Sequence, residues 1–295
     1  MITTINMAFH IHKNHKNILS LSLIQISLCM LMASLFAHLA FFTLLANLCY
    51  GFNPRLLTAR ATIPTAGSGG WSTARASWYG NPSGAGSDGG ACGYQNSVEE
   101  APYSSLITAA ASSLYKSGSG CGTCYQVKCT HAAVCSGKPV TVVITDECPG
   151  CDSQSILFDL SGTSFGTMAR PGGEGQLRNV GIEQIQYKRV NCNFPGATVS
   201  FRVDPGSNPN YFAAAIEHED GDGIAGVELK RAGSGGTWIK MQPSWGAVWK
   251  ADLPNNYPAP FSVRLTGNSG KKIVANNVIP ANYSPGKTYR SVVNF

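Results

Sequence analysis

One stretch, Gly120-Cys-Gly-Thr-Cys-Tyr-Gln-Val-Lys-Cys129, places three cysteines in and before an alternating run that predicts a strand over 125–130. Of the ten cysteines in the chain, two lie in an apolar leader and eight lie between Cys92 and Cys192. An even set within about a hundred residues is typical of a disulfide framework formed in an oxidising compartment. No cysteine follows Cys192. This asymmetry predicts a cross-linked first domain and a disulfide-free second domain.

The leader favours secretion. An apolar run over residues 18–50 follows a start that carries two lysines and several histidines. The run is long enough to span a bilayer, but a start at Met32 leaves a compact apolar segment that ends in small residues near Gly51. We therefore predict a cleaved secretory signal over 1–51, with a membrane anchor as the alternative. A Gly- and Ser-containing flexible leader is expected over 52–70.

The rest of the chain follows an all-β pattern. Short alternating runs are separated by Gly, Pro and Asn clusters, which predicts a β-barrel-like domain over 71–195 and, after a linker at 196–199, a β-sandwich over 200–295. Helices are expected over 104–115, which is rich in Ala and Leu, and over 161–169. Trp238 and Trp249 alternate with apolar neighbours, so both are assigned to the core.

Charge excludes few functions. The net charge is +6, and removing residues 1–51, with two lysines and no acid, leaves 20 bases against 16 acids, or +4. These bases are spread along both domains, which argues against nucleic acid as a partner. A mildly basic protein suits acidic extracellular polysaccharides, although an ordinary protein surface has the same balance.

Several short motifs match known sites without their context. The glycines of 84–89 fit a dinucleotide pattern, but no helix opens there, and a loop needing positive φ explains them better. Cys121 and Cys124 resemble a papain-type signature, yet no histidine falls at the required spacing. The two Cys-x-x-Cys pairs fit disulfides better than zinc in an exported chain. The acidic turn over 217–222 lacks calcium-ligand spacing and is expected to be solvated. Asn282 begins a glycosylation sequon.

The carboxylates and aromatic residues carry the functional hypothesis. Asp159 lies inside a predicted strand, in Leu157-Phe158-Asp159-Leu160, and Asp146 ends another. Neighbouring strands lie about 5 Å apart, so the two acids are predicted to share a groove. Each charge would then raise the pKa of the other carboxyl, so that at least one pKa is raised. The alternatives are turn capping for Asp146 and a lone surface acid for Asp159. Cleaving a glycosidic bond normally takes two carboxylates, and Asp159 has no clear partner. Exposed aromatic rings stack on sugars, and the candidates are Trp78, Tyr79, Tyr211 and Trp245.

Together these motifs resemble the expansin family, and within it the β-expansins, which include the grass-pollen group-1 allergens. The resemblance covers residues 71–295 in order. The matching blocks are Ala76-Ser-Trp-Tyr-Gly80, Asp88-Gly-Gly-Ala-Cys-Gly-Tyr94, Gly120–Cys129, Val142-Val-Ile-Thr-Asp-Glu-Cys148, Phe158-Asp-Leu-Ser-Gly-Thr163, Asn208-Pro-Asn-Tyr211 and Ser244-Trp-Gly-Ala-Val-Trp249.

The resemblance implies a six-stranded double-psi β-barrel, related to family-45 endoglucanases, followed by an immunoglobulin-like cellulose-binding domain. Asp159 matches the catalytic acid of those enzymes, whereas Gly80 stands after Trp78-Tyr79 where their second aspartate follows an aromatic pair. The implied glycan-binding residues are Trp78, Tyr79, Asp88, Asp146, Asp159, Tyr211 and Trp245. The implied disulfides are Cys92–Cys121, Cys124–Cys192 and Cys129–Cys135, which leaves Cys148 for Cys151. Leu157 departs from the family, which usually has His there.

We therefore predict a secreted, monomeric protein of the plant cell wall that needs no cofactor or metal. It is expected to bind glucuronoarabinoxylan and cellulose and to loosen the wall without hydrolysis. The alternatives are an endoglucanase or lytic transglycosylase, with Asp146 as the base in an inverting reaction, and a barwin-like carbohydrate-binding defence module.

Overall fold

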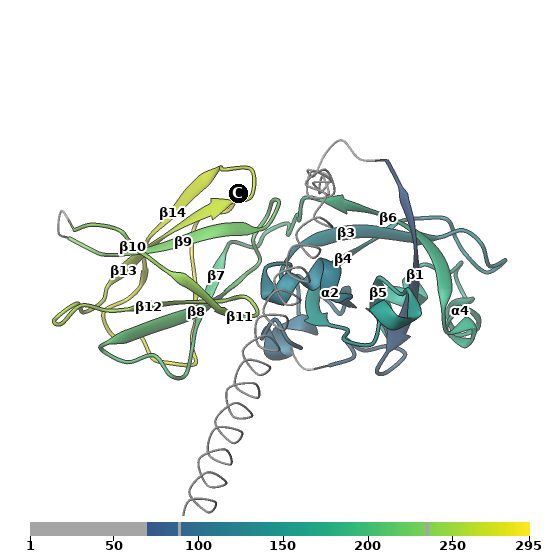
Figure 1. Cartoon of the computed structure of the whole chain (residues 1–295), viewed down its shortest axis with the longest axis horizontal. Coiled ribbons are helices and arrows are strands. Elements are labelled where there is room, and N and C mark those ends of the chain that lie inside the picture. The colour runs from purple at the N-terminus through teal and green to yellow at the C-terminus, as the bar shows by residue number, and fades with distance from the viewer. Residues whose placement is uncertain (1–69, 88–89, 234–235) are drawn as a thin grey trace, which may run out of the picture. The chain divides into compact units, whose positions relative to one another are not determined.

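The computed structural model describes residues 70–87, 90–233 and 236–295, which Figure 1 draws as coloured ribbons. The predicted signal region, nearly all of the leader and Asp88 lie outside the described residues. The described chain is all-β, with a closed barrel followed by a two-sheet sandwich, which confirms the predicted fold class. No helix in these three ranges is long and apolar enough to cross a membrane.

Six strands close the barrel in the order β1-β5-β2-β4-β3-β6. Two of the neighbouring pairs, β1 with β5 and β2 with β4, are parallel, and the others are antiparallel. Alternate side chains fill the barrel, among them Ala76, Phe158 and Leu160, all fully buried. The strands are β1 (Ser72–Tyr79), β2 (Ile107–Ala110), β3 (Cys124–Cys129), β4 (Val140–Glu147), β5 (Phe158–Ser161) and β6 (Glu183–Val190).

The helices agree with the sequence in one place and not in another. Helix α3 (Gly162–Thr167) lies within the predicted 161–169, and the Ser161 hydroxyl caps it by accepting from the Ser164 N–H at 3.0 Å. The helix predicted over 104–115 is wrong: β2 occupies its centre, and only α2 (Ser112–Tyr115) is helical. Pairing with β4 and β5 on both sides overrides the helix preference of alanine. Helix α4 (Glu174–Val180) was not predicted. The short 3-10 helices are η2 (Gln95–Val98), η3 (Lys116–Gly118) and η4 (Asp152–Gln154).

The second domain is a sandwich of a four-stranded sheet, β10-β9-β13-β14, and a five-stranded sheet, β11-β12-β8-β7-β15. The core between them includes Phe201, Phe212 and Leu265. Trp249 packs partly against this core, but Trp238 lies against Lys230 and Arg264, so its assignment to the core is wrong. The strands are β7 (Ser200–Val203), β8 (Tyr211–Glu217), β9 (Ile224–Arg231), β10 (Ile239–Lys240), β11 (Gln242–Trp245), β12 (Val248–Asp252), β13 (Phe261–Gly267), β14 (Lys272–Ile279) and β15 (Thr288–Arg290).

Four disulfides cross-link the first part of the chain. They are the same pairs that the resemblance implied: Cys92–Cys121, Cys124–Cys192, Cys129–Cys135 and Cys148–Cys151. Cys124–Cys192 ties the start of β3 to the segment that follows β6, across 68 positions of sequence. It therefore anchors the barrel where the chain leaves it for the sandwich.

Candidate functional site

A row of four residues crosses the barrel from β1 to β4, and we call it the carboxylate row: Ser77, Asp159, Ala109 and Asp146. Strand pairing aligns Ser77 with Asp159, Asp159 with Ala109, and Ala109 with Asp146. Residues aligned in register point to the same face of a sheet. Because the adjacent Phe158 and Leu160 point into the barrel, the carboxylate row faces outward.

A β-bulge brings Asp146 into this row. The register between β2 and β4 shifts between Thr108 and Ala109, so that Thr145 is skipped and Asp146 takes its place opposite Ala109. Asp159 and Asp146 were predicted to lie on neighbouring strands. That prediction is wrong, because β2 lies between β5 and β4. Two strand spacings separate their backbones by about 10 Å.

Asp159 is the better candidate for proton chemistry. Its carboxylate accepts a short hydrogen bond, 2.5 Å, from the Ser77 hydroxyl. Burial raises the pKa of Asp159, the Ser77 hydrogen bond opposes that shift, and the negative charge of Asp146 adds to it. Leu157, at the position where His was expected, is half-buried against the barrel core and contributes no titratable group.

Asp146 is already occupied by hydrogen bonds. Its Oδ1 accepts from the backbone N–H groups of Ala91 at 2.6 Å and Glu147 at 2.8 Å, and its Oδ2 accepts from the Ser87 hydroxyl at 3.1 Å. Three of about four acceptor positions on the carboxylate are therefore in use. Gly90 has φ 48°, and a Cβ there would lie 2.3 Å from Cγ of Asp146, so only glycine lets the loop approach so closely.

The two adjacent aromatic residues of β1 lie on opposite faces of the strand. Tyr79 is on the face of Ser77, and burial raises its pKa to about 12, with the charges of Asp146 and Asp159 adding to the effect. Its ring packs against Gly86, where a Cβ would come within 2.5 Å. Trp78 packs partly against the barrel core, and its indole N–H donates to the Arg178 carbonyl at 2.9 Å.

The remaining two aromatic candidates lie on the five-stranded sheet of the sandwich. Tyr211 on β8 packs against the small buried cluster formed by Ala213, Ala215 and Val248, on the face opposite to the sandwich core. Trp245 on β11 aligns with Val248 and is 51% exposed. Tyr211 aligns with Asp252, four residues from Val248, so the two rings are offset by about 13 Å along the strand direction.

Residues 90–93 connect these two groups of candidates. Ala91 donates to Asp146, and the neighbouring Cys92 carbonyl accepts from the Ala247 N–H at 3.0 Å. Gly93 has φ 78°, and a Cβ there would lie 2.5 Å from the Trp245 ring. A four-residue loop therefore contacts the carboxylate row through one end. Through the other end it contacts the hairpin of β11 and β12, which we call the Trp245 hairpin.

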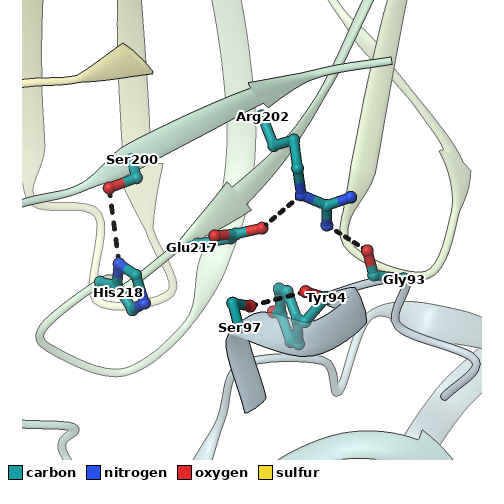
Figure 2. A network of polar contacts seen from close by, with 7 residues as sticks. All are labelled: Gly93, Tyr94, Ser97, Ser200, Arg202, Glu217 and His218. Carbon is teal, nitrogen blue, oxygen red and sulfur yellow. Dashed lines mark hydrogen bonds and ion pairs between the residues drawn. The ribbon is translucent and has the colours of Figure 1, made fainter. Parts of the chain in front are cut away.

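Figure 2 shows a second contact between the barrel and the sandwich. The Arg202 guanidinium on β7 donates to Glu217 at 2.8 Å and also to the Gly93 carbonyl. Nearby, Ser200 lies 3.4 Å from Nδ1 of His218. Ser77 and Arg202 were not predicted from the sequence as site residues. Ser77 lies two positions before Tyr79 in the predicted strand, so it could have been placed on the same face as Tyr79. No sequence pattern pointed to Arg202.

The acidic segment 217–222, which begins at the last residue of β8, was predicted to be solvated, and that prediction is wrong for its two glutamates. Glu217 and Glu219 are 3% and 7% exposed. Burial raises the pKa of Glu219 to about 8, with Asp222 and Asp220 adding to the shift, whereas burial lowers the pKa of His218 to about 4. Within the described ranges, no three His, Cys, Asp or Glu side chains are grouped to hold a metal ion.

Two protein-family models match the chain: "Lytic transglycolase" over residues 107–187 and "Expansin C-terminal domain" over residues 199–280. Expansin-B11 of Oryza sativa subsp. japonica is 56% identical over 231 residues, which is 77% of this chain and 78% of that protein. Expansin-B4 of Arabidopsis thaliana is 47% identical over 264 residues, or 88% and 97%.

The chain belongs to the expansin family, in its B group. The solved structure of a Clavibacter michiganensis expansin is 23% identical to this expansin, with a TM-score of 0.58, and covers 76% of this chain and 98% of its own. That likeness supports the fold. A mutant of the same bacterial protein was solved in complex with cellohexaose, with a TM-score of 0.57.

Proposed function

We propose that this expansin is secreted and loosens plant cell walls by binding cellulose and matrix glycan, including glucuronoarabinoxylan, without cutting a glycosidic bond. One observation carries the non-hydrolytic part. Asp159 has a raised pKa, but the nearest acid of its row, Asp146, lies two strands away and already accepts three hydrogen bonds. Hydrolysis needs a second carboxylate free to act as base or nucleophile.

The proposed glycan contacts are Trp78, Tyr79, Asp88, Asp146, Asp159, Tyr211 and Trp245. Loop 90–93 supports a single extended surface, since it contacts both the carboxylate row and Trp245. A sugar chain bound along both domains would spread its binding energy over many residues. A strained chain could then be peeled from its neighbour, with Asp159 donating a proton or hydrogen bond to a sugar oxygen at acidic pH. The complex of the bacterial relative with cellohexaose supports a glucan as ligand.

We propose cleavage of the signal near Gly51, a barrel domain over 71–195, a linker over 196–199 and a sandwich over 200–295. The mature protein would act as a monomer in the cell wall and carry a glycan on Asn282, whose side chain lies on an exposed turn.

The inverting endoglucanase is the second candidate, and the shared orientation of the two acids in the carboxylate row favours it. Asp146 and Asp159 face the same side of the sheet, as an acid and a base on either side of a bound sugar would. The two proposals predict different products, because only hydrolysis releases reducing ends.

The test is extension of heat-inactivated plant wall strips under constant load, with released reducing ends and anhydro-sugars assayed in the same bath. We expect extension without new ends, and loss of most extension in Asp159→Asn. Asp152→Asn is the matched control, because Asp152 is exposed and lies outside the carboxylate row. New ends that appear in proportion to extension would favour the endoglucanase, and full extension with Asp159→Asn would remove Asp159 from the mechanism.

A further inference from the structure

The outer face of the four-stranded sheet is separate from every residue of the proposed glycan surface. In β9 and β13, Val227, Leu229, Val263 and Leu265 point into the sandwich core. Side chains alternate along a strand, so their neighbours point away from the core on the other side. The five-stranded sheet, which carries Tyr211 and Trp245, lies across that core and presents its own outer face in the opposite direction.

Four cations gather on this face, which we call the basic face: Lys230, Lys240, Arg264 and Lys272. Strand pairing aligns Lys240 and Arg264 on either side of Glu228, aligns Lys272 with Thr266, and puts Lys230 opposite Ser262. Glu228 is the one acid in the described residues of β9, β10, β13 and β14. Four cations and one acid leave a local charge of +3.

The one acid does not neutralise the lysines. Arg264 holds Glu228 through two hydrogen bonds of 2.6 Å, a bidentate pair. Within the described part of the chain, Lys230, Lys240 and Lys272 have no ion-pair partner. Three ammonium groups are therefore free for an external anion.

Trp238 stiffens part of this arrangement. The Arg264 guanidinium lies 4.4 Å from the centre of the Trp238 ring, and Nζ of Lys230 lies 5.8 Å from it. Cation–π contacts of this length restrict long side chains that would otherwise move freely. Cations held in place lose less entropy when an anion binds.

We propose that the basic face binds a carboxylated polysaccharide, a polymer of uronic acid residues, at a site independent of Trp245 and Tyr211. Three ammonium groups, carried on three different strands of one sheet, match single negative charges spaced along an extended chain. Such a polymer is the expected polyanion of the extracellular matrix. The proposal rests on the proposed function only in assuming that the protein acts outside the cell. A duplex nucleic acid, with its denser phosphates, is the competing ligand.

The test titrates the full chain with soluble polygalacturonate at low ionic strength, by calorimetry or fluorescence anisotropy. Its methyl ester serves as the uncharged comparison. The face variant combines Lys230→Gln, Lys240→Gln and Lys272→Gln. The charge-matched control combines Lys116→Gln, Lys138→Gln and Lys287→Gln, three exposed lysines outside the basic face and the proposed glycan surface. Thermal unfolding of each variant checks that the fold is retained.

We expect the face variant to bind polygalacturonate about tenfold more weakly, because three exposed ion pairs are lost, and the control to change by about twofold or less. Binding should also disappear in about 1 M salt, where the Debye length is about 3 Å, and should be absent with the methyl ester. Trp245→Ala should leave polygalacturonate binding intact while weakening cellulose binding.

Three results would overturn the proposal. Equal losses in the two triple variants would mean that net charge alone attracts the polymer. Equal binding of the methyl ester would mean that the carboxylates are not recognised. Tighter binding of a duplex DNA at the same ionic strength would assign the face to another class of polyanion. None of these measurements uses a cell wall, so they stand apart from any failure to extend wall strips.

Discussion

Asp159 and Ser77 are adjacent across the parallel pair of β1 and β5, and their hydrogen bond of 2.5 Å orients the carboxylate outward. The raised pKa of Asp159 is dominated by burial and not by Asp146. The charged form of Asp159 is therefore less favourable in the folded protein than in water. This is expected of a group that acts on a ligand and does not stabilise the fold.

Replacing Asp159 by Asn should not destabilise the protein at neutral pH. A carboxyl group whose pKa is raised by folding binds its proton more tightly in the folded state, so stability falls as pH rises from its unfolded pKa through its folded pKa. Asn keeps an oxygen that accepts from Ser77 and removes the charge. We expect the melting temperature of Asp159→Asn to equal or exceed that of the wild type at pH 7. Melting curves at pH 4 and pH 7 check this; a deficit that grows toward pH 7 would contradict it.

The loop over 90–93 shows how an element can be dictated by close contacts. Gly90 and Gly93 both have positive φ, and each lies where a Cβ would strike a candidate binding residue, Asp146 or Trp245. A side chain at either position would face two penalties, one from the backbone and one from the collision. The glycines are therefore a requirement of the contact between the barrel and the Trp245 hairpin.

Gly93→Ala should lower stability and displace Trp245, because its Cβ would lie 2.5 Å from the ring. Gly137→Ala is the matched control, since Gly137 also has positive φ, at 71°, with nothing within 4 Å of its Cβ. The control should cost about 1–2 kcal/mol from the backbone alone. Gly93→Ala should cost more and also weaken cellulose binding, measured by pull-down on microcrystalline cellulose. Equal effects on stability and unchanged binding would show that the Trp245 ring does not depend on Gly93.

Two of the disulfides should differ in their contribution to stability. Cys124–Cys192 closes a separation of 68 positions, and Cys148–Cys151 closes one of 3. The loop-entropy relation predicts about 4 kcal/mol for the first and about 2 kcal/mol for the second. Double replacement by serine, followed by denaturant unfolding, measures each loss. A larger loss from the short bridge would mean that its local geometry outweighs the chain entropy.

Across the whole molecule, ionisable groups are buried where the barrel meets the sandwich. Arg202 bridges Glu217 and the Gly93 carbonyl (Figure 2). The backbones of Cys192 and Gly221 exchange two hydrogen bonds of 2.7 and 3.1 Å. Glu219 and His218 lie in the same region, and both are buried in their neutral forms near pH 6, since their pKa values are about 8 and about 4. The junction between the domains is therefore suited to mildly acidic conditions.

Glu219 should make the folded state less stable as pH rises toward 8. Its pKa is about 8 when folded and about 4.5 when unfolded, so stability falls over that interval; His218 acts in the opposite direction, but only between about 4 and 6.5. From pH 6.5 to 8 His218 no longer opposes the decline due to Glu219, which should amount to about 2 kcal/mol. Glu219→Gln should flatten that decline in urea unfolding experiments. A decline of unchanged slope in the variant would assign it to another group.

Much of the architecture was determined by the sequence alone. Alternating runs and turn residues predicted an all-β chain of two domains, because side-chain period and turn chemistry are local properties. The restriction of the cysteines to the first domain predicted the cross-linked barrel. The motif around Asp159 pointed to the acid whose side chain faces outward from the barrel in the structure. The helix predicted over 104–115 failed, because two flanking strands, and not local preference, decide the conformation of Ile107–Ala110.

Only the tertiary structure decided which residues meet. The bulge at Thr145 aligns Asp146 with the Asp159 row, and no local pattern in β4 reveals a register shift against β2. The burial of Glu217 and Glu219, the contact of Gly93 with Trp245 and the gathering of lysines on the basic face each join segments far apart in the chain. Such contacts depend on strand order and domain packing, which arise from long-range burial that a single sequence does not display.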